Sequence, residues 1–463
     1  MKNEKESNKV RSKKIGGELM KLSKYKKVSK ISDDIYAVYN TLLMDVLFVE
    51  KKELELIEKF KAGNNLLPTL LKSGIYVENE TVDEKAFEIQ KSTVMEQVGK
   101  ISVIYVILTT KCNLKCDYCS VKYMSESNIS NKIDLLQEEI IDKFIEEYKK
   151  YAEINNLRKI EFIFYGGEPL LGWEKIIYFV NKVETVFDSN YTILFSMVTN
   201  GTLMTENKIE FCKNHQIQIG ISIDGPMNIN DRCRHFACGN RSVYLNVLKN
   251  LKLMKKHKFT PNLSLTVTNE VIDAKDEIFN WLIEIKEQYG INTVSYNLLH
   301  CIENIEEKKE YYKKVAAFVT ESYNKLGMYI VDERITRKIS PLYEGNMFHG
   351  DCAAITGNQI VLKPNGKIGI CQELCENNQD TVDDLNKMDL KDIISKIDFR
   401  EYNSILPIMR EKCLDCEAIF TCGGGCYWEM DDRLNNGDTG YCIYSKSVHK
   451  WLLNMMWNLL END

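Results

Sequence analysis

Six strand-like runs separated by amphipathic helices fill the middle of the chain, and this alternation constrains the fold more than any other feature. The runs lie at 103–109, 161–165, 193–199, 219–224, 263–268 and 293–297. In the helical stretch at 133–152, apolar residues from Leu136 to Tyr148 repeat along one face. Strands alternating with helices predict an α/β fold with a parallel sheet, either doubly wound or curved as an incomplete barrel. In such folds the chemistry lies at the carboxyl ends of the strands.

The size and composition of the chain limit the kinds of protein it can be. Its 463 residues are too many for one ordinary hydrophobic core, so we expect two or three domains. The net charge of −6, from 61 basic and 67 acidic residues, argues against nucleic acid as the main partner. Residues 1–14 lack the apolar core of a secretory signal, and the most apolar stretch, 101–110, is too short to cross a membrane. We therefore predict a cytoplasmic protein that works away from membranes.

The chain contains 15 cysteines. In a reducing cytosol, cysteines in such numbers bind metals or perform chemistry more often than they form disulfides. An odd total also fits poorly with a fully paired disulfide framework. Metal binding is therefore the first expectation for these residues.

The sequence divides into four parts by pattern. We expect a flexible basic leader at 1–30, a small module at 31–95, the strand–helix part at 96–340 and a cysteine-rich part at 341–463. In the module, 35–49 predicts two strands with a turn near Asn40, and 51–63 predicts a helix that ends at Gly63. A short helix, a glycine turn and an extended piece follow. Pattern alone favours a structural cap or dimerisation arm and a peptide-binding module equally.

Three cysteines, Cys112, Cys116 and Cys119, lie in one short loop directly after the first strand. Three thiolates can hold three irons of a cubane 4Fe–4S cluster and leave the fourth iron open to an external ligand. A structural zinc site is the alternative, but it would need a fourth protein ligand, and no further His or Cys lies nearby in the sequence. The spacing therefore favours a cluster with a vacancy for a substrate or cofactor.

Polar and glycine-rich segments follow the next three strands. At the end of the second, Gly166 and Gly167 would let the backbone approach a ligand, Glu168 offers a carboxylate to an ammonium group, and Pro169 stiffens the turn. The third and fourth strands end with hydroxyl, amide and carboxylate groups that suit a ribose and an adenine edge. The candidate cofactor-binding residues there are Ser196, Thr199, Asn200, Ser222 and Asp224.

Together these segments resemble the radical S-adenosylmethionine superfamily over roughly residues 101–300. The cysteine loop matches its C-x3-C-x2-C motif, with the aromatic Tyr118 before the last cysteine, and 166–169 matches the segment that receives the methionine amino group. The resemblance implies an incomplete (β/α)6 parallel barrel. It also implies that the methionine amine and carboxylate chelate the open iron. One electron then cleaves the sulfonium to methionine and a 5′-deoxyadenosyl radical, which abstracts a substrate hydrogen.

A further motif of the superfamily, a His-Asp-x-x-Arg run, is partly present. Asn230 replaces the histidine, while Asp231 and Arg234 are kept. The resemblance therefore makes Arg234 a candidate cofactor-binding residue. No catalytic residue is identified beyond the cluster, and no general base is assigned.

The C-terminal cysteines resemble the SPASM pattern, which carries two auxiliary 4Fe–4S clusters. By that resemblance one cluster is held by Cys413, Cys416, Cys422 and Cys442, and the other by Cys352, Cys371 and Cys426. The fourth ligand of the second set is open, and Cys375 or a substrate thiol are the candidates. A zinc ribbon is the alternative. Cys212 and Cys301 fit small core residues, and Cys233 and Cys238 match no motif.

Enzymes with this arrangement divide mainly into sulfatase maturases and maturases of ribosomally made peptides. The module at 31–95 resembles a winged helix that grips a leader peptide, and Gln372 occupies the position where sulfatase maturases tend to carry an aspartate base. We therefore expect S-adenosylmethionine, three 4Fe–4S clusters, a precursor peptide and a flavodoxin- or ferredoxin-type reductant. The expected product is a cysteine thioether. Carbon–carbon crosslinking, formylglycine formation and a non-enzymatic, metal-stabilised peptide-binding scaffold are the alternatives.

Overall fold

A computed structural model describes most of the chain. The described residues are 12–15, 18–43, 45–61, 63, 65–119, 135–300, 302, 304–327, 329–344, 347–348, 350–374, 381–427 and 440–462. They form two compact units: the first comprises 1–96, 337–352 and 403–463, and the second comprises 97–336 and 353–402. Among the described residues, no helix is both long and apolar enough to span a membrane.

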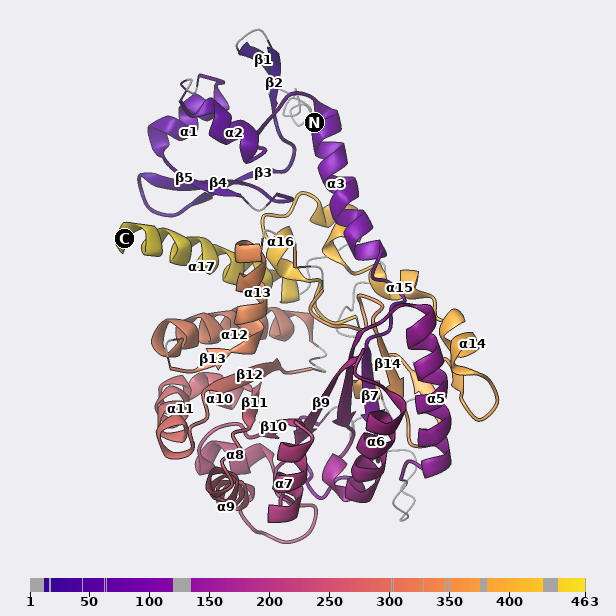
Figure 1. The fold of residues 1–463 in the computed structure, drawn as a ribbon. Helices are drawn as coiled ribbons and strands as arrows, with labels where there is room; N and C mark the ends of the chain where they lie inside the picture. Colours follow the sequence, from indigo (N-terminus) through magenta and orange to yellow (C-terminus); the bar gives the residue numbers. More distant parts are fainter. Residues whose placement is uncertain are drawn as a thin grey trace. The chain divides into compact units, whose positions relative to one another are not determined.

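A ten-stranded sheet runs through the second unit (Figure 1). Its centre consists of β7 (Val103–Ile107), β8 (Lys159–Tyr165), β9 (Thr192–Thr199), β10 (Gln218–Ser222), β11 (Asn262–Val267) and β12 (Thr293–Leu298). Each of these strands pairs in parallel with the next, in chain order. The six predicted strands and their parallel arrangement are therefore confirmed. The closure of the sheet into an incomplete barrel stays a prediction.

Four short strands extend the two ends of this sheet. They are β13 (Val331–Asp332), β14 (Gln359–Leu362), β15 (Lys367–Gly369) and β16 (Asp383–Asp384). β13 pairs in parallel with β12, and β14 pairs in parallel with β7. β15 and β16 continue beyond β14 in antiparallel pairing. β7, the strand that precedes the three-cysteine loop, is thus an interior strand and not an edge.

Helices connect the parallel strands of this unit (Figure 1). They are α5 (Glu138–Ile154), η1 (Pro169–Gly172), α6 (Trp173–Val186), α7 (Glu206–Asn214), α8 (Met227–Cys233), α9 (Val243–Lys256), α10 (Asn269–Asp273), α11 (Lys275–Tyr289) and α12 (Ile305–Leu326). The described C-terminal helices are α13 (Glu333–Glu344), η2 (Gln372–Leu374), α14 (Leu390–Ser395), α15 (Phe399–Asn403), η3 (Pro407–Met409), η4 (Glu411–Cys413), α16 (Ile419–Cys422) and α17 (Gly440–Asn462).

The two faces of the parallel sheet differ in chemistry. On one face Phe162 is fully buried and packs edge-to-face on Phe179 of α6, with ring centroids 5.2 Å apart. The opposite face is mixed: Ile163 points to it, but so do Glu161 and Ser222, which are polar and only half-buried. Because side chains alternate along a strand, one face is apolar beneath the helices, and the other, here called the polar face, carries polar side chains as well as apolar ones. Parallel sheets are usually apolar on both faces, so these polar residues are candidates for ligand contacts.

The predicted flexible leader at 1–30 is wrong over the described residues 12–15 and 18–30. The structure contains β1 (Ser12–Ile15), β2 (Glu18–Leu22) and β3 (Lys26–Lys30). The lysines of this stretch suggested a solvated tail, but they alternate with apolar residues. Met20 and Tyr25 are each only 2% exposed, while Lys21 pairs with Glu80 at 2.7 Å. Alternation of this kind builds strands with one buried face.

The rest of the N-terminal module follows the prediction in part. β4 (Ile35–Asn40) and β5 (Val46–Glu50) form the expected hairpin, and α1 (Lys51–Glu58) the expected helix. This helix ends before Gly63, because Phe60 adopts a φ of 53° and stacks on Tyr76. α2 (Leu67–Lys72) and β6 (Tyr76–Val77) come next. The expected extended piece is short, because Asn79 caps a further helix, α3 (Glu80–Met95).

The cysteine-rich region does not form one unit over 341–463 as predicted. Residues 353–402 belong to the unit of the parallel sheet, since β14 pairs beside β7. Residues 403–463 belong with the N-terminal module. There Tyr39 of β4 packs against Phe420 of α16 and His449 of α17, with ring centroids 6.1 and 5.4 Å apart. The division of this region between the two units results from strand pairing and aromatic packing. The spacing of the cysteines reveals neither.

Candidate active site at the carboxyl ends of the strands

The cysteine loop that follows β7 is held along its backbone by the segment after α8. Lys115 donates its amide to the carbonyl of His235 at 2.7 Å, and Asp117 donates to Cys233 at 3.0 Å. Leu114 forms an isolated antiparallel bridge with Phe236. These bonds fix the loop main chain between the first two cysteines and beyond. This pairing was not predictable from the sequence, because the two segments are far apart in the chain.

Gly166 and Gly167 pack directly on the backbone that leads into the cysteine loop. The amide of Gly167 donates to the carbonyl of Thr109 at 3.0 Å, and that of Glu168 to Lys111 at 2.9 Å. A Cβ on Gly167 would lie 2.3 Å from the carbonyl oxygen of Lys111. Gly166 also has a φ of 129°, which side chains rarely tolerate. The predicted close approach is therefore present, but its partner is the protein's own cysteine loop.

Glu168 lies at the centre of the next contact and is only 1% exposed. Its carboxylate accepts hydrogen bonds from the Thr199 hydroxyl at 2.6 Å, the Asn200 amide at 2.8 Å and the Leu170 amide at 3.0 Å. Burial raises the pKa of Glu168, and these three bonds oppose that rise. The end of β8 is thereby tied to the end of β9.

Asn200 continues this connection to the cysteines. Its side-chain nitrogen donates to Asn113 Oδ1 at 2.9 Å and lies 3.8 Å from the sulfur of Cys112. Its side-chain oxygen accepts from the hydroxyl of Thr202 at 2.6 Å. A continuous set of bonds therefore runs from Glu168 to Cys112. Asn113 and Thr202 were not predicted as site residues, although both flank predicted ones.

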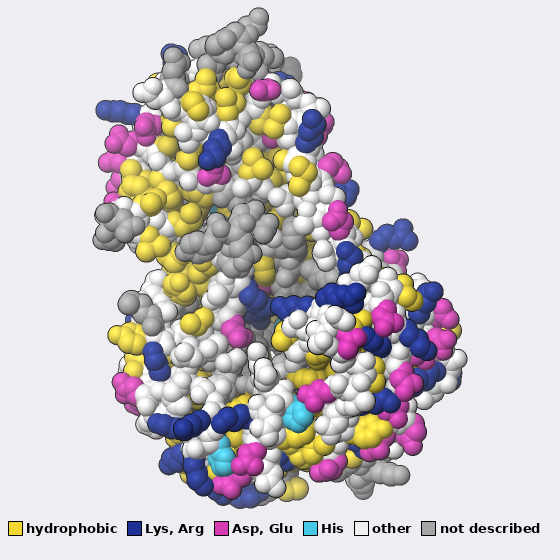
Figure 2. Space-filling view, viewed as in Figure 1, with side chains coloured by type: hydrophobic (Ala, Val, Ile, Leu, Met, Phe, Trp, Pro, Cys, Tyr) yellow, Lys and Arg dark blue, Asp and Glu magenta, His cyan; other side chains and the backbone are white. Residues whose placement is uncertain are grey.

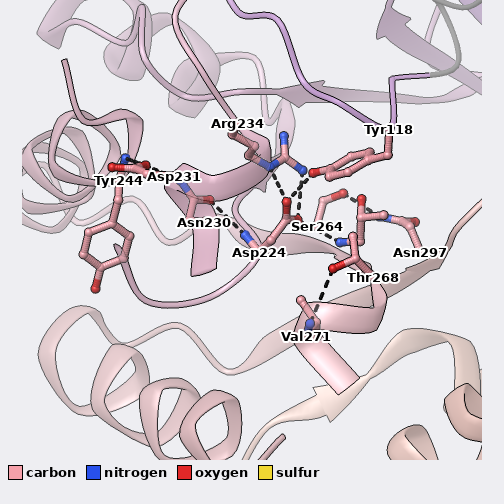
Figure 3. A network of polar contacts seen from close by, with 11 residues as sticks. Tyr118, Asp224, Asn230, Asp231, Arg234, Tyr244, Ser264, Thr268, Val271 and Asn297 are labelled. Carbon is pink, nitrogen blue, oxygen red and sulfur yellow. Dashed lines mark hydrogen bonds and ion pairs between the residues drawn. The ribbon is translucent and has the colours of Figure 1, made fainter. Parts of the chain in front are cut away.

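A buried ion pair lies at the end of β10 (Figure 3). Arg234 donates through Nε and Nη2 to the two oxygens of Asp224, at 2.7 and 3.0 Å. Asp224 also accepts from the amide of Thr266 at 2.9 Å and from the hydroxyl of Tyr118. The guanidinium lies 5.4 Å from the centre of the Tyr118 ring. This network joins the aromatic residue of the cysteine loop to two strands.

The partly matched His-Asp-x-x-Arg run thus has mainly structural contacts. Asn230 accepts from the amide of Asp224 at 3.1 Å, and Asp231 accepts from the amide of Tyr244 at 2.9 Å (Figure 3). Of the run, Arg234 is the residue whose charge faces the cysteine loop. Its cation lowers the pKa of Cys116, against the larger effect of burial.

The three loop cysteines suit an iron–sulfur cluster by their chemistry. Burial is the main cause that raises the pKa of Cys112 to about 12 and that of Cys116 to about 11. Nearby acidic side chains and the other thiols also act to raise both pKa values. Buried thiolates crowded in this way need compensating positive charge, which bound iron supplies. Within the described ranges, no three His, Cys, Asp or Glu side chains converge as ligands of one metal ion. A cubane cluster does not need its ligands to converge on one ion, because each thiolate binds a different iron.

The remaining predicted residues are placed as follows. Ser222 ends β10 on the half-buried polar face, and Pro169 begins η1. Ser196 lies three residues before the end of β9, and its hydroxyl donates to Glu161 at 3.1 Å. This bond does not connect Ser196 to the cysteine loop. Cys212 is fully buried, as expected of a core residue. Cys301 and Cys375 lie outside the described residues.

The C-terminal cysteines are distributed over both units. Cys413, Cys416, Cys422 and Cys442 all belong to the first unit. Burial raises the pKa of Cys416 to about 12, and the charge of Cys422 acts on both Cys413 and Cys416. In the other predicted set, Cys352 and Cys426 belong to the first unit and Cys371 to the second.

Comparison with known proteins agrees with this site. Residues 106–282 match the Radical SAM superfamily. The chain carries a radical SAM domain. This domain spans the cysteine loop, the two glycines, Glu168 and the Asp224–Arg234 pair, and membership implies S-adenosylmethionine and a 4Fe–4S cluster.

Two relatives and one solved structure extend the comparison beyond the radical SAM domain. The radical SAM cyclopropyl synthase TigE of Paramaledivibacter caminithermalis is 23% identical over 97% of this chain and 92% of its own length. A cysteine-type anaerobic sulfatase-maturating enzyme of Clostridium perfringens is 22% identical over 78% of this chain and 99% of its own length. The structure of anSMEcpe with bound AdoMet and Kp18Cys peptide is 20% identical, with a TM-score of 0.63 over 78% of this chain and 99% of that one. This chain therefore shares the fold of that structure.

The contact between Gly167 and the loop yields a direct prediction. Gly167→Ala would force the carbonyls of Thr110 and Lys111 away, because the new Cβ lies 2.5 and 2.3 Å from them. Overpacking of this kind costs about 1–3 kcal/mol. After anaerobic reconstitution the variant should lose about four irons per chain, one cubane cluster. Gly220→Ala on β10 is the matched control, since its Cβ would have no heavy atom closer than 3.9 Å. Equal iron in both variants would contradict this account of the loop.

Proposed function

We propose that the protein is a radical S-adenosylmethionine enzyme that modifies a ribosomally made precursor peptide. The observation that carries the proposal is the buried connection from Glu168 through Asn200 to Cys112 at the carboxyl ends of the strands. The 4Fe–4S cluster, when bound, supplies the electron that cleaves S-adenosylmethionine to methionine and a 5′-deoxyadenosyl radical. The proposed reductant is of the flavodoxin or ferredoxin type.

The chain's own residues have defined parts in this proposal. Cys112, Cys116 and Cys119 would hold the cluster on a loop whose backbone bonds are already made. Glu168 and Asn200 keep the ends of β8 and β9 in register with that loop. The half-buried polar face of the sheet would receive the nucleoside, and the helices behind the other face exclude water from the core. Positioning of this kind is what a short-lived radical requires.

The share of this chain that each relative covers favours a maturase of ribosomally made peptides over a sulfatase maturase. The sulfatase-maturating relative aligns over its whole length with 78% of this chain, so about a fifth of the chain exceeds it. Residues 1–96 make up a part of that size. TigE, in contrast, aligns over nearly all of both chains. In addition, Gln372 after Cys371 is an amide that accepts from Gln359 at 2.9 Å, where the sulfatase maturases tend to have a carboxylate base.

Two products are candidates. The first is a thioether between a cysteine sulfur and a carbon of another residue. The second is a carbon–carbon bond, which the similarity to a cyclopropyl synthase over nearly the whole chain favours. Both reactions remove two hydrogens from the peptide, so its mass alone does not separate them. The two products differ in whether a cysteine thiol is consumed.

The reaction is tested on a precursor peptide incubated anaerobically with reconstituted enzyme, reductant and S-adenosylmethionine. We expect a product that lacks two hydrogens, measured by mass spectrometry. Alkylation with iodoacetamide then counts free thiols. One thiol fewer than in the starting peptide indicates a thioether, and an unchanged count in a product without an aldehyde indicates a carbon–carbon bond. Formylglycine would contradict peptide crosslinking and support the sulfatase-maturase alternative: made from cysteine it appears as loss of the sulfur, and made from serine it appears as loss of two hydrogens with an aldehyde that a hydrazide reagent detects.

The N-terminal module is the proposed binding site for the leader of the precursor. One of its two three-stranded sheets has the order β3-β4-β5, so β3 and β5 present their outer edges to another strand. Large apolar side chains of the module, among them Val28, Leu43 and Leu56, are exposed. Figure 2 shows such apolar surface on the module in the upper part of the view. Main-chain bonds to an added strand would supply affinity, and binding there would raise the concentration of the core peptide.

Leader binding is tested on the intact chain. Deleting the module is unsuitable, because the hydroxyl of Tyr39 bonds to His449 at 3.0 Å and to the carbonyl of Glu417 at 3.3 Å. Hydrogen–deuterium exchange with and without precursor should show slower exchange of amides in β3 or β5. A precursor with a scrambled leader is the control. If exchange slows only elsewhere and both edge strands are unchanged, the module does not bind the leader at these edges and acts as a structural cap.

A further inference from the structure

Lys338 of α13 is a lysine whose side chain is fully buried. Lysine is rarely buried unless its charge is paired. Its ammonium lies 3.3 Å from a carboxylate oxygen of Asp351 and donates to the carbonyls of Thr421 and Cys422, at 3.1 and 3.0 Å. The hydroxyl of Tyr441 lies 3.2 Å away. One buried cation is therefore fixed beside a proposed cluster ligand.

Aromatic rings complete the surroundings of this cation. Its nitrogen lies 4.9 Å from the ring centre of Phe348, 5.6 Å from that of Tyr441 and 5.9 Å from that of Tyr444. Rings at such distances favour a positive charge and exclude water. The low dielectric that results strengthens the electrostatic effect of Lys338 on its neighbours.

The backbone that follows Cys422 makes a glycine turn. Gly423, Gly424 and Gly425 have φ values of 70°, 84° and 82°, a run that side chains would strain. The carbonyl of Gly423 accepts the amide of Asp351 at 2.9 Å. Lys338 and its carboxylate partner are therefore both tied to the backbone beside the Cys422 ligand.

The predicted ligand set fits a cluster at this place. The amide of Cys416 donates to the carbonyl of Cys413 at 3.0 Å, so these two ligands share one turn. The charge of Cys422 raises the pKa of both, which agrees with a position close to them. The hydroxyl of Tyr441 also bonds to the carbonyl of Cys422 at 3.4 Å. That bond ties Tyr441, the residue before Cys442, to the segment of Cys422. Four thiolates make such a cluster anionic, and reduction adds a further negative charge.

We infer that Lys338 is a positioning residue for this auxiliary cluster: it holds the Cys422 ligand segment and raises the redox potential of the cluster. The inference rests on the proposed function and on the SPASM resemblance, which assigns an auxiliary cluster to Cys413, Cys416, Cys422 and Cys442. A fixed positive charge stabilises the more negative, reduced form. Asp351 offsets part of that charge. Removing the lysine charge and removing the carboxylate charge therefore have opposite effects on the potential.

The experiment measures redox potentials by electron paramagnetic resonance in the full-length chain. The cysteines of the radical SAM loop are replaced by alanine, so that only auxiliary clusters contribute. The relevant signal is assigned beforehand as the one lost in Cys413→Ala. Lys338→Met should shift its potential to more negative values, and Asp351→Asn to more positive values. Lys338→Arg keeps the charge and should stay near the wild-type potential. Lys450→Met, at an exposed lysine of α17, is the control for loss of a surface charge.

Each outcome decides the inference. Opposite shifts in the two charge variants, with little shift in Lys338→Arg and Lys450→Met, support it. A retained cluster with an unchanged potential in Lys338→Met overturns it while leaving the proposed function intact. If Lys338→Met loses the cluster, the Asp351→Asn variant decides. A more positive redox potential in that variant supports the inference, and an unchanged potential overturns it. A parent chain without auxiliary iron would contradict the cluster assignment, and the inference with it.

Discussion

The contact between the backbone of Gly166 to Glu168 and the backbone of Thr109 to Lys111 is the constraint on which the site depends. It brings the end of β8 within main-chain hydrogen-bond distance of the cysteine loop, and only glycine leaves room for it. Once that contact forms, the Glu168 carboxylate is buried and needs donors. β9 supplies them through Thr199 and Asn200. The position of the backbone that leads into the cysteine loop therefore follows from packing at the strand ends.

The polar face of the sheet explains how such a core can also be an active site. Apolar residues such as Phe162 and Phe179 make one face a close-packed layer with the helices. The other face carries residues such as Glu161 and Ser222, which a core would exclude. The buried Arg234–Asp224 pair lies at the end of this face and fixes Tyr118 of the cysteine loop. A buried ion pair adds little to stability, so we interpret it as a device that orients the loop.

Much of this arrangement was predictable from local pattern. Runs of alternating or continuous apolar residues between amphipathic helices predicted all six parallel strands. The motifs after these runs predicted that Glu168, Asn200 and Asp224 lie at strand ends. Contacts between distant segments were not predictable. The pairing of Lys115 with His235 and the packing of Tyr39 on His449 depend on tertiary structure alone. The lysine-rich stretch before residue 30 was misjudged because composition outweighed its alternation, in which Met20 and Tyr25 point inward.

The central claim is that Cys112, Cys116 and Cys119 hold the cluster at which S-adenosylmethionine is cleaved. The most direct measurement is the 5′-deoxyadenosine formed under anaerobic, reducing conditions by the reconstituted chain and by the variant with these three cysteines replaced by alanine. The account predicts steady formation by the parent chain and none by the variant, while the variant keeps iron at its C-terminal cysteines. Formation of 5′-deoxyadenosine by the variant, or none by a parent chain that is fully loaded with iron, would contradict it.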